Sequence, residues 1–189
     1  MRMRKNLLRA GGLVVLASLG LAIGAQAQEK PAHKYIGATK CSVCHKAEAK
    51  GNQYGAWMKS AHAKAFETLA SEKALAIGKE KGIAKPQESD ACLKCHVTGH
   101  GKAAALFEPT FKKEEGVSCE SCHGAGSDYK AMNVMKDLAA AKAAGLVIPD
   151  EKTCTACHNT ESPTFKPPFD FKAMAAKVAH PNPAKVKKS

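Results

Sequence analysis

The chain has 189 residues and a formal net charge of +12 at pH 7, with 24% charged but only 5% aromatic residues. All three arginines, Arg2, Arg4 and Arg9, stand at the N-terminus. The other basic residues are lysines, which lack the planar fork that recognises phosphates and base edges. The charge therefore argues against a nucleic-acid-binding protein. Because protein interiors are close-packed, the few aromatic residues predict that something other than side chains fills this interior.

Residues 1–27 are predicted to be a Sec signal peptide. Four positive charges precede an apolar run over residues 10–23, and Ala25-Gln26-Ala27 matches a small-x-small cleavage site. The run is short for a membrane span, which needs about 20 residues. We expect an exported protein, periplasmic or extracellular, without a stable membrane anchor. Cleavage would leave 25 lysines against 17 acidic residues, a net charge of +8.

All eight cysteines fall into four copies of Cys-x-x-Cys-His. The copies are Cys41-Ser42-Val43-Cys44-His45, Cys92-Leu93-Lys94-Cys95-His96, Cys119-Glu120-Ser121-Cys122-His123 and Cys154-Thr155-Ala156-Cys157-His158. This is the attachment signature of c-type haem, since two thiols bond one porphyrin and the adjacent histidine reaches its iron.

A zinc ribbon and a disulfide framework are the alternatives. Zinc, however, requires no histidine behind every second cysteine, and the four motifs leave no cysteine for a disulfide. We therefore predict four covalently bound haem c groups, with His45, His96, His123 and His158 as iron ligands. The tetrahaem domain is expected to span residues 28–180, followed by a flexible lysine-rich tail over residues 181–189.

The segments between the motifs predict a mostly α, compact multihaem cytochrome with a haem-packed core and little or no β structure. Helices are expected over residues 54–69, 71–84, 130–144 and 169–178. The first of these would place Met58, His62, Phe66 and Leu69 on one face. Gly145 is expected to cap the third helix.

Four histidines lie outside the motifs, and three of them are expected to be the sixth ligands of haem irons. His62 has bulky apolar neighbours on its predicted helix, and His180 follows the last helix. His33 lies shortly before the first motif. The alternatives are an ordinary buried histidine for His62, a solvated tail for His180 and a frayed N-terminus for His33.

His100 cannot reach the vacant side of the haem of its own motif, because that haem would stand in between. It is expected to be a surface or propionate-bonding histidine, and the alternative is that it binds the iron of a neighbouring haem. Gly99 and Gly101 flank it and leave its backbone poorly constrained. Met132 and Met135 are alternative thioether ligands, which would raise the potential of a haem. The role expected first for both is packing within their own helix.

Several stretches resemble a known family: Lys40 to Lys46, the Trp57 to Ala65 segment, Cys92 to Gly99 and Gly116 to Gly126. The chain is similar over residues 37–180 to the tetrahaem cytochrome c family of the electron acceptor of hydroxylamine oxidoreductase in ammonia oxidisers. This family has relatives in metal-reducing bacteria.

The resemblance implies stacked haem pairs, histidine-ligated irons, and one haem without a protein sixth ligand at the second motif. It also implies a distal histidine shortly after the third motif, where Met132-Asn133 stands in this chain. Either His33 substitutes for that histidine, or a second haem is open or methionine-ligated.

The function expected first is a periplasmic carrier of anaerobic respiration that passes electrons between redox-protein donors and acceptors, without a catalytic side chain. Histidine-ligated haems suit this role because they reach low potentials. One alternative is an enzyme that reduces a small ligand, such as nitric oxide, at a five-coordinate haem. Another is a subunit of an extracellular haem filament.

Overall fold

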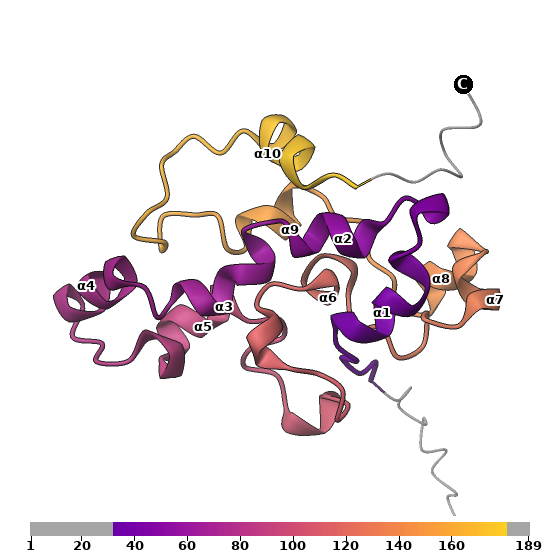
Figure 1. The fold of residues 1–189 in the computed structure, drawn as a ribbon, viewed down its shortest axis with the longest axis horizontal. Helices are drawn as coiled ribbons and strands as arrows, with labels where there is room; N and C mark the ends of the chain where they lie inside the picture. Colours follow the sequence, from indigo (N-terminus) through magenta and orange to yellow (C-terminus); the bar gives the residue numbers. More distant parts are fainter. Residues whose placement is uncertain (1–31, 181–189) are drawn as a thin grey trace, which may run out of the picture. The chain divides into compact units, whose positions relative to one another are not determined.

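The described part of the chain, residues 32–180 of a computed structural model, is a succession of short helices (Figure 1). The chain divides into two units, residues 1–31 and residues 32–189, and all described residues belong to the second. The predicted signal peptide and the predicted tail therefore lie outside the described residues. The α-helices are α1 (Ala38–His45), α2 (Gln53–Met58), α3 (Ala65–Thr68), α4 (Glu72–Glu80), α5 (Asp90–His96), α6 (Cys119–His123), α7 (Met132–Met135), α8 (Leu138–Ala143), α9 (Glu151–Thr155) and α10 (Phe171–Val178).

Five single turns of 3₁₀-helix join these elements. They are η1 (Glu48–Lys50), η2 (His62–Lys64), η3 (Pro86–Glu88), η4 (Ala104–Leu106) and η5 (Lys113–Glu115). Within residues 32–180, the β structure is limited to an isolated bridge between Tyr35 and Phe107. The prediction of a mostly α chain with little or no β structure is confirmed.

The helix predicted over residues 54–69 is in fact three pieces, α2, η2 and α3. Where the pieces separate, hydrogen bonds to Val117, a distant residue, are present in place of a continuous helix. The Trp57 indole N–H donates to the carbonyl of Val117 at 2.9 Å, and the Val117 N–H donates to the carbonyl of His62 at 3.1 Å. The prediction of one shared face was therefore wrong. Met58 is 48% exposed, whereas Leu69 is buried.

The helix predicted over residues 130–144 is likewise divided, into α7 and α8. The break occurs because the Asp137 carboxylate accepts hydrogen bonds from the N–H groups of Ala139 and Ala140 and thereby caps a new helix. Gly145 follows α8 with φ +97°, as expected of a residue that ends a helix.

Side-chain caps also set the starts of α4 and α10. The Ser71 hydroxyl accepts from the Ala74 N–H, and α4 begins at the next residue, Glu72. The Asp170 carboxylate accepts from the Ala173 N–H, so α10 begins two residues later than the predicted position 169.

Few side chains are buried in this part of the chain. Among residues 32–180 the buried hydrophobic residues are Ile36, Ala38, Leu69, Leu93, Val97, Tyr129 and Ala141. Leu69, Leu93 and Val97 form a small core, against which Phe66, Cys92 and Phe111 pack. A fold of this size normally buries more apolar surface. Side chains therefore line much of the space inside the fold but do not fill it.

Candidate functional site

The four Cys-x-x-Cys-His motifs lie in or at the end of four short helices. The first occupies α1, the second α5 and the third α6, and in each the histidine is the last helical residue. The fourth motif begins within α9 and continues into the turn that carries Cys157 and His158. A helical turn brings residues three apart onto one side. Both cysteines of a motif can therefore face one ligand.

A buried carboxylate ties the third motif to the start of the first. Glu120, inside the third motif, is 2% exposed. It accepts hydrogen bonds from the N–H groups of Ile36 at 2.9 Å, Gly37 at 2.8 Å and Gly126 at 2.7 Å. Burial raises the pKa of Glu120, and the three N–H donors oppose that rise.

Glu115 adds a further bond to the same helix. Its carboxylate accepts from the N–H of Ala38, the first residue of α1, at 2.8 Å. The first N–H groups of a helix have no partner within it. Two carboxylates from the neighbourhood of the third motif thus position the helix that carries Cys41, Cys44 and His45.

Neighbouring cysteine side chains group the motifs in two pairs. Cys41 of the first motif lies beside Cys119 of the third. Cys95 of the second motif lies beside Cys157 of the fourth. The ammonium of Lys94 also pairs with the Glu161 carboxylate just after the fourth motif, raising the pKa of Lys94 and lowering the pKa of Glu161.

Thr98 connects the two pairs. Its hydroxyl accepts from the Ser118 N–H at 2.8 Å and donates to the carbonyl of Gly116 at 2.9 Å. The Thr98 N–H donates to that same carbonyl, also at 2.9 Å. Thr98 and Ser118 are buried, so these bonds hold the end of the second motif against the start of the third.

Three motif histidines use Nδ1 for a hydrogen bond and leave Nε2 available. Nδ1 of His45 bonds the amide oxygen of Gln53 at 3.1 Å. Nδ1 of His96 lies 2.6 Å from the carbonyl of Ala65, and Nδ1 of His123 lies 3.1 Å from the carbonyl of Val147. Metal-binding histidines commonly have this second partner, which fixes the ring orientation and the tautomer.

Two non-motif histidines stand opposite motif histidines. The ring centroids of His62 and His158 are 5.9 Å apart, and those of His123 and His180 are also 5.9 Å apart. A metal–nitrogen bond is about 2 Å long, so two imidazoles on opposite sides of one metal ion have centroids roughly 6 Å apart. Both pairs therefore match the spacing of two axial ligands.

Burial favours the neutral form of His62, His123 and His180 by lowering their pKa, and the neutral form is the one that binds a metal. Burial, and then the neighbouring His158, lowers the pKa of His62. Burial also lowers the pKa of His123 and of His180. The Phe169 ring stacks on His158 with centroids 5.5 Å apart and closes one side of that pair.

The other two non-motif histidines have carboxylate partners. Nδ1 of His33 lies 2.7 Å from Asp128, and Nε2 of His100 lies 2.9 Å from Asp90. The structure thus brings His62 and His180 to motif histidines, while it holds His33 beside Asp128. An iron-binding role for His33 stays a prediction.

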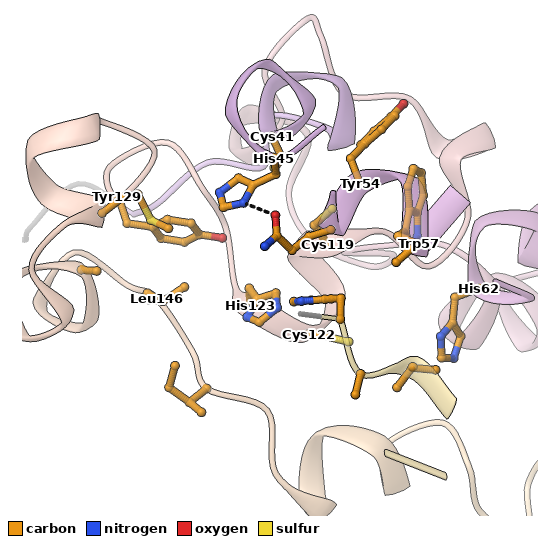
Figure 2. Close-up of a pocket in the computed structure, with 18 of the residues that line it drawn as sticks. Cys41, His45, Tyr54, Trp57, His62, Cys119, Cys122, His123, Tyr129 and Leu146 are labelled. Carbon is orange, nitrogen blue, oxygen red and sulfur yellow. Dashed lines mark hydrogen bonds between the residues drawn. The ribbon is translucent and has the colours of Figure 1, made fainter. Parts of the chain in front are cut away.

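A cavity of about 670 Å³ lies between the first and third motifs. His45 and His123 enter it from α1 and α6, with Tyr129 and Leu146 on one side and Trp57 and His62 on the other (Figure 2). Its volume is that of a site for a cofactor-sized molecule. Cys41 and His45 of the first motif and Cys119, Cys122 and His123 of the third line it, so its chemistry fits covalently attached haem.

The alternatives of zinc and disulfides do not fit this geometry. Within the described residues, no three His, Cys, Asp or Glu side chains lie together as a metal ion would require. All eight cysteines are free thiols.

Residues 32–180 contain no helix that is long and apolar enough to cross a membrane.

The sequence analysis did not identify Glu120, Glu115, Thr98 or Gln53 as parts of the site. The sequence does point to two of them, because Glu120 stands inside the third motif and Thr98 stands two residues after the second. Their burial, however, depends on contacts between segments far apart in the chain. Gln53 and Glu115 carry no signal at all in the sequence.

Known proteins provide an independent comparison. The family model described as "Cytochrome c554 and c-prime" matches residues 40–124, which include the first three motifs. Cytochrome c-554 of Nitrosomonas europaea is 34% identical over 179 residues, covering 83% of this chain and 71% of that relative. The solved structure of the reduced state of cytochrome c554 from Nitrosomonas europaea matches with a TM-score of 0.49 and 27% identity, over 82% of this chain and 83% of that chain.

Proposed function

We propose that this chain, which belongs to the cytochrome c554 family, is a tetrahaem c-type cytochrome. Its role is to carry electrons between redox proteins of the periplasm. The observation that carries the proposal is the convergence of four motifs in two pairs, with His62 and His180 opposite two of the motif histidines.

The eight motif cysteines would attach the haems, and each of the four motif histidines would bind one iron. A bound haem supplies an iron that takes up and releases one electron at a time. His62 would hold the iron of the fourth motif together with His158, and His180 would hold that of the third together with His123. The hydrogen bonds of Nδ1 keep Nε2 of His45, His96 and His123 directed at the metal.

Electron transfer needs cofactors that lie close together, and the chain supplies this proximity. The Cys41–Cys119 and Cys95–Cys157 contacts bring each pair of attachment points together. The buried bonds of Thr98 connect one pair to the other. Redox partners of this class dock over small interfaces. The lysine-rich mature surface offers a docking face for an acidic partner.

Haem counting tests the proposal directly. Protein matured by the cell should contain four haems per chain in a pyridine haemochromogen assay. A Cys154→Ser/Cys157→Ser double variant should contain three. Stopped-flow mixing with a reduced periplasmic redox protein should reduce the oxidised protein. Fewer than four haems, or no electron exchange with any redox protein tested, would contradict it.

Export is part of the same proposal. Fractionation of cells that express the full chain should find the protein in the periplasm, and N-terminal sequencing should begin at Gln28. Protein that remains in the cytoplasm with Met1 intact would count against both the predicted signal peptide and the attachment of haem c.

A second candidate function is the binding and reduction of a small ligand, such as nitric oxide, at the second motif. Its support is that His100 is engaged with Asp90, and that within residues 32–180 His96 has no opposed histidine of the kind found for His123 and His158. An iron with one free position can bind diatomic ligands. Carbon monoxide should therefore shift the spectrum of one haem in the reduced protein and leave the histidine-ligated haems unchanged. No shift would exclude this function.

A further inference from the structure

We propose that the thioether sulfur of Met135 is the sixth ligand of the iron at the first motif, on the side opposite His45. The inference rests on the proposed attachment of haem at Cys41 and Cys44. It makes this haem chemically different from the two that His62 and His180 complete.

The histidines do not account for the iron at the first motif. His62 is opposite His158, and His180 is opposite His123. Nε2 of His100 is bonded to Asp90, at the start of the helix that carries the second motif. Nε2 of His33 faces the backbone of Gly145, where an added Cβ would lie 2.8 Å from it, and His33 does not line the cavity that His45 enters.

Met135 lies in the right cavity. The cavity that His45 lines is also lined by Met135, but not by Met132. Met135 is half-buried, whereas Met132 is 60% exposed. In Figure 2 the His45 ring bonds Gln53 on one side, and its other nitrogen faces the part of the cavity where Tyr129 lies. Met135 follows Tyr129 closely in the chain and lines the same cavity.

The fold holds this methionine in place from both ends of α7. Upstream, Tyr129 is buried and its hydroxyl donates to the carbonyl of Gly124 at 2.7 Å, directly after the third motif. Downstream, Asp137 caps α8 and ends α7 shortly after Met135. The break that divides the predicted helix therefore also sets where the thioether stands.

The other side chains that line this part of the cavity are poorer ligands. The Tyr129 hydroxyl is already committed to Gly124. Lys136 and Lys142 also line it, but an ammonium has no lone pair and must lose a proton before it binds a metal. A thioether is neutral and needs no proton loss. Met/His ligation is an established arrangement for haem iron.

The consequence is an uneven set of potentials. A methionine ligand raises the potential of a haem above that of a histidine-ligated one. The haem at the first motif is then reduced before the haems at the third and fourth motifs. Among these three haems, an electron is then held first by the one beside α1 and α7.

Spectroscopy of the oxidised and reduced protein tests this assignment. A thioether-ligated ferric haem has a weak far-red absorption band, and the ligand methyl of its ferrous form has a strongly upfield-shifted proton resonance. We expect both signals from one haem of the four. Met135→Leu should abolish them and turn one haem high-spin, while Met132→Leu, the matched control, should keep them. Met135→His should also abolish them, but with that haem low-spin and its potential lowered.

Each other outcome overturns the assignment. Absence of both signals from the native protein excludes a methionine ligand, and loss of the signals in Met132→Leu moves the ligand to Met132. If Met135→Leu fails to fold, the native spectrum and the Met135→His potential still decide. A count of four haems without a thioether signal refutes only this inference, whereas a count below four refutes the proposed function.

Discussion

The two motif pairs are held together by different kinds of bond. Between the first and third motifs, a buried carboxylate bonds three backbone N–H groups through Glu120, and Glu115 bonds a fourth. Between the second and fourth motifs, the charged contact is the surface pair of Lys94 and Glu161, both largely exposed. Buried hydrogen bonds have no water to replace them, while surface pairs do. The comparison teaches that buried bonds to the backbone fix the first pair. In the second pair only the second motif packs against the core of Leu69, Leu93 and Val97, and an exposed ion pair links it to the fourth.

The largest effect is expected from substitutions that remove one proposed iron ligand from each region. His180→Ala should convert the haem at the third motif from low-spin to high-spin, and His62→Ala should do so at the fourth, because each loses its opposed imidazole. Electron paramagnetic resonance of the oxidised protein measures this change. His100→Ala is the control and should leave every haem as it was. A variant of His62 or His180 with an unchanged spectrum would remove that residue from the ligand set.

Glu120→Ala should cause the next largest effect, a loss of folding stability. It leaves three backbone N–H groups without a partner in a buried place, and each such group costs about 1–3 kcal/mol. We expect a loss of at least about 3 kcal/mol in the free energy of unfolding, measured by denaturant titration of the haem-loaded protein.

The control for this prediction is Glu114→Ala, which removes an exposed carboxylate next to Glu115. It should change the stability little. If Glu120→Ala is no more destabilising than Glu114→Ala, the first pair does not depend on its buried carboxylate, and the difference between the two regions disappears.

Gly116→Ala should have a smaller effect, on the contact between the two regions. Gly116 has φ +66°, and an added Cβ would lie 2.8 Å from the carbonyl oxygen of His62. Strain of this kind costs about 1–3 kcal/mol. The segment that would have to move carries His62, the proposed ligand at the fourth motif. Denaturant titration should detect the loss, with a partial high-spin signal from one haem.

Gly101→Ala separates the two causes of that strain. Gly101 also has a positive φ, +81°, but its added Cβ would meet nothing within 4 Å. It should lose stability from its backbone conformation alone and show no high-spin signal. Equal spectra for the two variants would contradict a steric link between Gly116 and His62.

Lys94→Ala should have the smallest effect of the series. It removes the exposed ion pair with Glu161, which water and salt already weaken. We expect the unfolding midpoint to stay within the error of the measurement and to respond to salt as the native protein does. A clear loss of stability at low salt that disappears at high salt would show that both regions depend on polar bonds.

Local sequence was a good guide wherever a structure depends on neighbouring residues. The cap at Gly145, the last helix before His180 and the low β content follow from spacing and residue type. The predicted helix over residues 54–69 failed because Trp57 and His62 bond the backbone of Val117, a residue distant in the chain. The predicted face of Met58 and Leu69 failed with it.

The candidate site divides in the same way. Its attachment points are readable as four motifs, and His62 and His180 were identified as candidates from their neighbours along the chain. Which motif each of them faces was not readable, because His180 meets His123 only after the chain returns through α10 (Figure 1). Glu120 and Thr98 were missed because a polar residue is recognised as structural only when its burial is known.

The sequence by itself determined the cofactor class, since a covalent attachment signature is local chemistry that survives in any fold. It also predicted that side chains alone do not fill the interior, because few large aromatic residues are present. Only the tertiary structure decided how the motifs pair and which histidines stand opposite one another. It also showed that His45 and Met135 line the same cavity, in which each of the other lining histidines already faces a histidine. These are relations between distant segments. Burial and hydrogen bonding, which no local pattern encodes, determine them.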